Sequence, residues 1–283
     1  MIESIKNATK AGKEFVNLSK KNPDQFTDDG DPVIDFMIQK ELYGATADPY
    51  PASQNMPDWY KNASSELSEN HLGGNNVASC IPFFDSLTTG WIIPVPVDIE
   101  VSIRNGNMNF DWSSDIKFVD AHSRETVTDH FPDEHKLALQ IYHKWAWSVP
   151  QGYSVLMTEP FNRMETRWKA MTGIVDADNY MGPVNGSLIW QDFEFEGIIE
   201  AGTPLFQVIP FKRDGLITEG KVRPMDEEDQ LEVDQTTNKV LNKRHYYKNE
   251  AWENHTKSRN IPHETSDSDS EDGSSSCPFH FGK

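Results

Sequence analysis

Residues 150–211 contain three short apolar runs separated by turn-forming residues, and this pattern constrains the fold more than any other part of the chain. The runs are residues 154–158, 187–198 and 205–211, and a Gly-Thr-Pro turn precedes the last of them. The second run alternates between apolar and polar residues. Short runs of this kind, bounded by glycine and proline, indicate β-strands and not helices. We therefore expect a sheet in this part of the chain.

The residues before this stretch show further strand patterns. A mostly apolar run at 33–39 predicts a first buried strand, and residues 80–103 predict a strand block. Within that block, residues 97–103 alternate, which is typical of a strand with one buried face. Residues 137–147 alternate in the same way and predict another half-buried strand.

A hairpin is predicted at Asn105 and Gly106. An Asn-Gly pair between two alternating segments is the strongest short-range signal for a tight turn between antiparallel strands. The returning strand is then expected at residues 108–112.

The overall charge limits the classes of partner. The chain has 283 residues, a net charge of -19 and a pI near 4.8. Such a field repels phosphate backbones, so nucleic acid is an unlikely partner. The two cysteines, Cys80 and Cys277, give no disulfide framework, and we see neither a signal peptide nor a membrane-spanning run. We expect a protein of the cytoplasm or of a virion that is not secreted and does not enter a membrane.

The composition also changes along the chain, which predicts its domain organisation. Four parts are expected: an N-terminal extension at 1–30, a β core domain at 31–215, an acidic linker with a basic aromatic helix at 216–264, and an acidic serine-rich tail at 265–283. The tail has too few apolar residues to order itself. Tyr246 and Trp252 are expected to dock the basic helix on the β core. The predicted fold class is mainly β, a barrel or sandwich with short terminal helices and a disordered acidic tail.

The order of motifs in the middle of the chain resembles the trimeric dUTPase and dCTP deaminase superfamily, which has the β-clip fold. The matching positions are Pro150, Gly152 and Tyr153 at a strand start, Gly173, Ile174, Val175, Asp176 and Asp178 in a Gly-Ile-Val-Asp-x-Asp segment, and Gly202, Gln207 and Ile209 in a closing strand. The resemblance covers about residues 145–211. It implies a β-clip core and self-association, because members of that superfamily form trimers.

The resemblance also implies a set of site residues for a nucleotide hydrolase or deaminase. The catalytic residues would be Asp176, Asp178 and Tyr180, and the ligand-binding residues would be Tyr153, Arg163 and Gln207. Two departures from the family pattern count against this activity. The phosphate-binding motif is replaced by residues 158–163, which include Glu159, so Mg²⁺ would be needed to offset the negative charge. Tyr180 lies one residue later than in the family, which redirects its side chain.

Two features keep alternative interpretations open. Asp176 is either a catalytic carboxylate or a turn residue whose side chain caps local N–H groups. The second feature is a set of possible metal ligands for a cupin-like oxygenase: His122, Asp129, His130, Asp133, Glu134, His135 and His143. Their spacing matches no metal-binding motif, so we assign no metal ligand and favour a solvated loop.

Without the phosphate-binding motif, the sequence favours a non-catalytic binding or assembly protein on a dUTPase-like scaffold. Its expected partners are other proteins and further copies of the chain, as in a viral or phage structural component, and no cofactor is expected. A nucleotide enzyme that uses Mg²⁺ is the alternative, and a metal-dependent oxygenase is the third.

Overall fold

The computed structural model describes residues 32–62, 77, 80–122, 137–243 and 246–252. The chain divides into two compact units. Unit 1 comprises Met1–Tyr50 and Trp91–Leu216, and unit 2 comprises Pro51–Gly90 and Ile217–Lys283. The predicted N-terminal extension at 1–30 and serine-rich tail at 265–283 lie outside the described residues.

Within the described residues, fourteen strands form four antiparallel sheets. The strands are β1 (Asp35–Met37), β2 (Tyr50–Pro51), β3 (Trp91–Pro94), β4 (Ile99–Arg104), β5 (Asn107–Asp111), β6 (Val119–Ala121), β7 (Ala138–Ile141), β8 (Ala146–Ser148), β9 (Tyr153–Thr158), β10 (Trp168–Ala170), β11 (Gly173–Val175), β12 (Ser187–Trp190), β13 (Gly197–Ile199) and β14 (Pro204–Lys212). The sheet orders are β11-β9-β14-β3-β2, β10-β12-β7-β6, β13-β4-β5 and β1-β8. The mainly β class is therefore confirmed, and none of these sheets closes into a barrel within the described residues.

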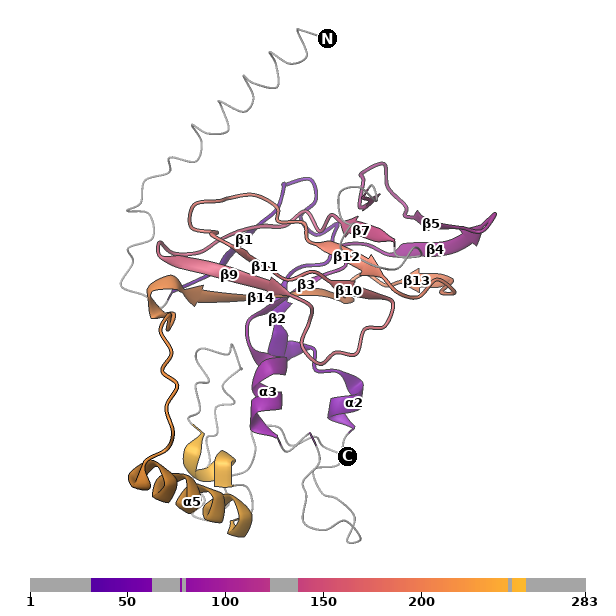
Figure 1. The fold of residues 1–283 in the computed structure, drawn as a ribbon. Helices are drawn as coiled ribbons and strands as arrows, with labels where there is room; N and C mark the ends of the chain where they lie inside the picture. Colours follow the sequence, from indigo (N-terminus) through magenta and orange to yellow (C-terminus); the bar gives the residue numbers. More distant parts are fainter. Residues whose placement is uncertain (1–31, 63–76, 78–79, 123–136, 244–245, 253–283) are drawn as a thin grey trace, which may run out of the picture. The chain divides into compact units, whose positions relative to one another are not determined.

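The five-stranded sheet is built on β14, which lies between β9 and β3 (Figure 1). The register places Phe211 opposite Ser154, and Gln207 opposite Thr158. The predicted runs at 154–158 and 205–211 are thus confirmed as strands that pair with each other. This pairing positions most of the polar residues discussed below.

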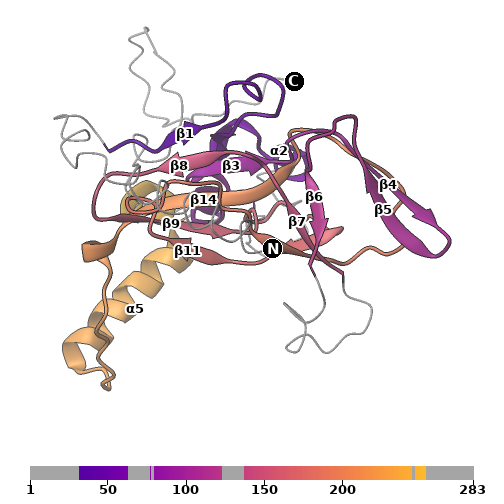
Figure 2. The ribbon, with the colours of Figure 1, turned by 90° about the horizontal axis from the view of Figure 1, so that it is seen from above.

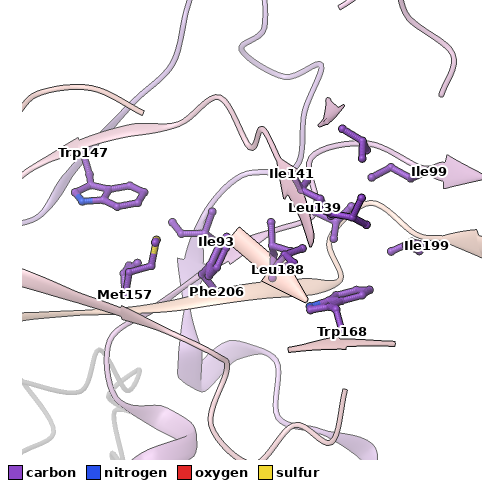
Figure 3. Close-up of a cluster of buried hydrophobic side chains, with 14 of the residues drawn as sticks. Ile93, Ile99, Leu139, Ile141, Trp147, Met157, Trp168, Leu188, Ile199 and Phe206 are labelled. Atoms are coloured by element: carbon purple, nitrogen blue, oxygen red, sulfur yellow. The ribbon is translucent and has the colours of Figure 1, made fainter. Parts of the chain in front are cut away.

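Side chains from several sheets meet in one hydrophobic core in unit 1. Figure 3 shows Trp147 and Met157 near Phe206 and Ile93, with Leu188 and Trp168 further along. These side chains are almost fully buried. Gly186 belongs to the same packing, because a Cβ there would lie 2.6 Å from Cζ of Phe206. Only glycine fits at this position without moving the core.

The predicted hairpin is confirmed. Strands β4 and β5 are joined by Asn105 and Gly106, whose φ angles of 55° and 74° are both positive, as a type I′ turn requires. The hairpin extends away from the five-stranded sheet (Figure 2). In β4, Ile99 and Val101 are buried while Glu100 is exposed, which confirms the predicted single buried face.

Two predicted strands are each divided in the structure. Residues 137–147 form β7 and then β8 in another sheet, because Lys144 takes a left-handed conformation with φ of 68°. Residues 187–198 form β12 and then β13, separated by a turn in which the Asp192 carboxylate accepts a hydrogen bond from the Glu194 N–H at 3.2 Å. Apolar residues keep alternating across Lys144, which is why the period alone did not reveal that break. Between Trp190 and Phe193 the alternation changes phase, and this signal of the second break was overlooked.

The predicted buried strand at 33–39 is shorter and more exposed than expected. Only β1 is extended, and Phe36 is its main contact with the core, with its ring centroid 5.2 Å from that of Trp91. Val33 is exposed.

The described α-helices lie in unit 2, and one of them corrects the predicted strand block. Residues 81–88 form helix α3 (Ile81–Thr88), with Pro82 in its first turn. Proline favours the first helical turn because its missing N–H would have no partner there, and this signal was overlooked in a continuous apolar run. Near α3 in the chain are the 3-10 helix η2 (Ala52–Gln54) and the short helix α2 (Asp58–Lys61). Met56, Tyr60 and Leu87 form a small separate core.

The C-terminal elements also differ from the prediction. After the 3-10 turn η4 (Arg213–Gly215) of unit 1, helix α5 (Glu227–Asn242) begins within the expected acidic linker and not at the basic segment. A single π-helical turn, η5 (Tyr247–Ala251), follows. Trp252 was expected to contact the β core, but its Nε1–H donates to Oδ2 of Asp85 in α3, at 3.1 Å.

Candidate functional site

The most densely bonded polar group in unit 1 is Asp178. Its Oδ2 accepts hydrogen bonds from the Gly152 N–H and from Nε2 of Gln151, both at 2.9 Å. Its Oδ1 accepts one from Arg213 at 3.0 Å, and a second nitrogen of Arg213 bonds Oδ2. The Asp178 side chain is only 1% exposed. Hydrogen bonding to Arg213 lowers the pKa of Asp178, and the bond from Gly152 adds to this, against the opposing effect of desolvation.

Arg213 comes directly after β14 and connects three segments. Its backbone N–H donates to the Gly152 carbonyl at 2.9 Å. Its guanidinium donates to the Tyr153 carbonyl at 2.6 Å and to Oγ of Ser154 at 3.0 Å, besides Asp178. The hydrogen bond to Asp178 raises the pKa of Arg213. We call Ser154, Asp176, Asp178 and Arg213 the aspartate–arginine cluster.

The sequence interpretation missed Arg213, although the chain carries a signal for it. Strand β14 pairs antiparallel with β9, so the residue that follows the end of β14 lies beside the start of β9. The register confirms this, because Lys212 pairs with Tyr153. A basic residue at that position can therefore reach the carboxylates of the 176–178 turn.

Asp176 lies in a turn, and its side chain bonds the start of β9. Its carbonyl accepts hydrogen bonds from the N–H groups of Asn179 and Tyr180, at 3.0 and 2.9 Å, so the segment is a turn. Its Oδ1 accepts a hydrogen bond from Oγ of Ser154 at 2.6 Å and lies 3.5 Å from Arg213. Its side chain is nevertheless 63% exposed. Asp176 thus supports the fold and still presents a carboxylate to solvent.

Tyr180 and Tyr153 lie near this turn, but they contact the chain in different ways. The ring of Tyr180 covers Gly182, where an added Cβ would be 3.0 Å from the Tyr180 hydroxyl, and the side chain is largely exposed. Tyr153 is half-buried and takes part in the cluster through its backbone carbonyl.

Gln207 is not part of this cluster. Its side chain is fully buried, and its Oε1 accepts a hydrogen bond from the Phe161 N–H at 2.9 Å. It pairs with Thr158, whereas Asp176 bonds Ser154, and these two residues of β9 are about 13 Å apart along the strand. The structure therefore places Asp176 and Gln207 at opposite ends of β9, and Gln207 holds the loop that follows β9.

That loop is the segment in which the resemblance would place a phosphate site. Glu159 is half-buried, and its Oε2 accepts a hydrogen bond from the Ala170 N–H at 3.2 Å. Arg163 is half-buried as well, and its burial lowers its pKa while nearby Tyr50 raises it. Glu159 is thus used within the fold, and its charge is unfavourable for a polyphosphate at this point.

The end of the same loop is fixed by a bidentate ion pair. Arg167 donates to both oxygens of Glu165, at 2.9 and 2.7 Å, and its guanidinium lies 4.7 Å from the ring centroid of Trp168. Burial raises the pKa of Glu165, but the hydrogen bonds from Arg167 outweigh this effect and the net change is a lowered pKa. Glu165 and Arg167 therefore connect the loop to the start of β10.

The two described histidines of the proposed metal set have structural contacts. His143 is fully buried, with Nε2 2.8 Å from the Val184 carbonyl and Nδ1 accepting from the Trp145 N–H at 3.1 Å. Burial lowers its pKa to about 4, so it is neutral at pH 7. His122 lies 3.3 Å from Oγ of Ser187. Residues 123–136, which carry the other proposed ligands, lie outside the described residues, and the described part of the chain holds no group of three or more metal-ligating side chains.

None of the described helices combines the length and the apolar character that crossing a bilayer requires.

Comparisons with known proteins give little further guidance. No protein-family model matches the chain, and no curated protein matches it. Among solved structures, one match is the native EIAV dUTPase, which is 13% identical, with 46% of this chain and 96% of that chain covered and a TM-score of 0.23. At this score the resemblance to dUTPase stays a prediction.

Proposed function

We propose that this protein is a non-catalytic binding or assembly protein on a β-clip-like scaffold, and that its partners are proteins. The observation that carries the proposal is the burial and hydrogen bonding of the Asp178 side chain. This carboxylate is almost fully buried and bonded to Arg213, Gly152 and Gln151. A carboxylate with a lowered pKa and several donors on both oxygens is a poor general base.

The other polar groups of the expected nucleotide site support the same conclusion. Gln207 and Glu159 accept hydrogen bonds from backbone N–H groups within the sheet and its loop. Groups that are bonded in this way are less available to a base or a phosphate. The β-clip assignment itself depends on the order of motifs in residues 145–211.

A partner-binding role is also supported by the edge strand of the five-stranded sheet. Strand β11 lies at one end of that sheet, and Ile174 on it is largely exposed. Met171 and Tyr180, which flank β11 in the sequence, are 40% and 53% exposed. An exposed edge with apolar side chains is a surface to which other chains can add.

A second candidate function is a nucleotide hydrolase or deaminase with Asp176 as its base. The observation in its favour is the exposure of the Asp176 carboxylate beside Ser154. Mg²⁺ would be needed near Glu159 to offset its charge.

Turnover assays separate the two functions. The purified chain is incubated with dUTP or dCTP and Mg²⁺, and products are separated by chromatography. We expect no conversion above the rate without protein, both for the wild type and for Asp176→Ala. Conversion by the wild type that Asp176→Ala abolishes would establish the enzyme and reject the binding proposal.

A further inference from the structure

Helix α5 has a well-defined start. The Asp226 carboxylate accepts hydrogen bonds from the N–H groups of Glu228 and Asp229, at 3.1 and 3.0 Å, and the Asp229 carboxylate accepts one from the Asp226 N–H at 3.0 Å. Arg223 donates to Oδ1 of Asp229 at 2.8 Å. This reciprocal capping box fixes the first turn, and the acidic residues there also suit the helix dipole.

The rest of α5 is exposed to solvent. The helix has 16 residues and none is buried. Its four aliphatic side chains, Leu231, Val233, Val240 and Leu241, are between 42% and 76% exposed. In water, isolated helices of about this length are only marginally stable, and most helices in proteins are stabilised by packing of an apolar face. Val233 and Val240 are seven residues apart and so lie on one face, which lacks a packing partner in the described part of the chain.

The charges along α5 are divided between its two ends. The charged residues of the first half and its cap are all acidic: Asp226, Glu227, Glu228, Asp229, Glu232 and Asp234. The second half carries Lys239, and Lys243, which also forms an ion pair with Glu250 at 2.8 Å, follows its last residue. A second copy of the helix that runs in the opposite direction places acidic residues beside lysines at both ends. A parallel copy would place like charges together.

We propose that α5 pairs in antiparallel orientation with α5 of a second copy of this chain, through the face that carries Val233 and Val240. Such a pair has two-fold symmetry, so every attractive contact between the acidic half and the lysines occurs twice. The inference rests on the proposed assembly role and names the partner.

Neither the size of the surface nor the total charge prevents this pairing. A single helix pair is smaller than the roughly 1,200 Å² of a stable interface, so a weak, concentration-dependent dimer is expected. The net charge of -19 is spread over the whole chain, and at physiological salt charges more than about 8 Å apart are largely screened. The local charges at the helix pair therefore decide its orientation.

Light scattering and analytical ultracentrifugation of the full chain over a range of concentrations test the proposal. The wild type should dimerise reversibly. Lys239→Glu with Lys243→Glu should raise the dissociation constant at least about tenfold, because attraction becomes repulsion at both ends. Lys169→Glu with Lys221→Glu makes the same change in net charge at exposed positions outside α5 and should leave the dissociation constant unchanged.

A mixing experiment checks the charge pairing directly. Glu232→Lys with Asp234→Lys should also weaken self-association, and an equimolar mixture with the Lys239→Glu and Lys243→Glu variant should form mixed dimers. All of these residues are exposed, and circular dichroism verifies folding. A wild type that stays monomeric, or a dimer that both sets of variants leave intact, would overturn the proposal. Either result would leave the nucleotide assay, and with it the non-catalytic function, unaffected.

Discussion

The aspartate–arginine cluster of unit 1 and helix α5 of unit 2 use charge in opposite ways. In the cluster, Asp178 is buried and its bonds to Arg213 join the ends of β9 and β14 to the 176–178 turn. In α5, the charges and the aliphatic side chains are exposed, and the first turn is fixed by a capping box. Buried polar groups therefore indicate how the sheet is held together, and exposed apolar groups on a helix indicate a surface for a partner.

The largest contrast between the two regions is expected in packing. Phe206→Ala should destabilise the protein by about 3–5 kcal/mol, because Phe206 is fully buried and a cavity remains. Leu241→Ala in α5 should change stability by less than about 0.5 kcal/mol. Chemical denaturation at low protein concentration measures both values. Equal effects would show that the core does not lie where Figure 3 places it.

Acid should destabilise unit 1 through His143. Burial lowers the pKa of His143 in the folded state to about 4, from its ordinary value of about 6.5, so the unfolded chain binds the proton more readily. Stability should therefore fall as the pH drops from about 6.5 to 4, by about 3 kcal/mol in all. Denaturation at several pH values checks this, with His143→Gln as the control that should lose most of the dependence in this range.

The buried carboxylate should matter more than the exposed one next to it. Asp178→Asn should lower the free energy of unfolding by about 2 kcal/mol. This is less than the loss expected for a fully buried ion pair, because Arg213 is partly exposed and solvent weakens the interaction. Asp176→Asn should lower the free energy of unfolding by less than this, although the Asp176 carboxylate accepts a hydrogen bond from Ser154. The stabilising effect of the Asp178 charge is present above its unfolded pKa of about 3.9 and should be lost as the pH falls below it. A larger loss for Asp176→Asn would reverse the roles assigned to the two residues.

The smallest effect on stability is expected from the valine face of α5. Val233→Asp with Val240→Asp should change the free energy of unfolding of the monomer by less than about 0.5 kcal/mol, because neither side chain is buried. The same variant should prevent dimerisation. A loss of several kcal/mol would mean that α5 packs within its own chain.

The sequence predicted those parts of the fold that local rules determine. The Asn105-Gly106 hairpin follows from turn geometry, and the β9 and β14 runs follow from apolar patterning between turn residues. The break at Lys144 was missed because alternation continues through it, and the break at Asp192 was missed although the alternation changes phase there. Helix α3 was missed because a short apolar run fits a helix as well as a strand.

The polar contacts were harder to predict than the strands. Asp176 and Asp178 were both recognised, but the sequence could not show which one would be buried, since this depends on Arg213 lying opposite Gly152 in the β9–β14 register. The role of Gln207 likewise depends on the position of Phe161, which is distant in the sequence. Such contacts are set by the tertiary fold and carry no local signature.

The central claim is that the polar residues of unit 1 hold the sheet together and do not bind a nucleotide. A calorimetric titration of dUTP and of dCTP, each with Mg²⁺, into the full chain tests it most directly. We expect no heat of binding beyond dilution at millimolar ligand. Saturable binding that Asp176→Ala removes, in a protein that remains folded, would contradict the claim.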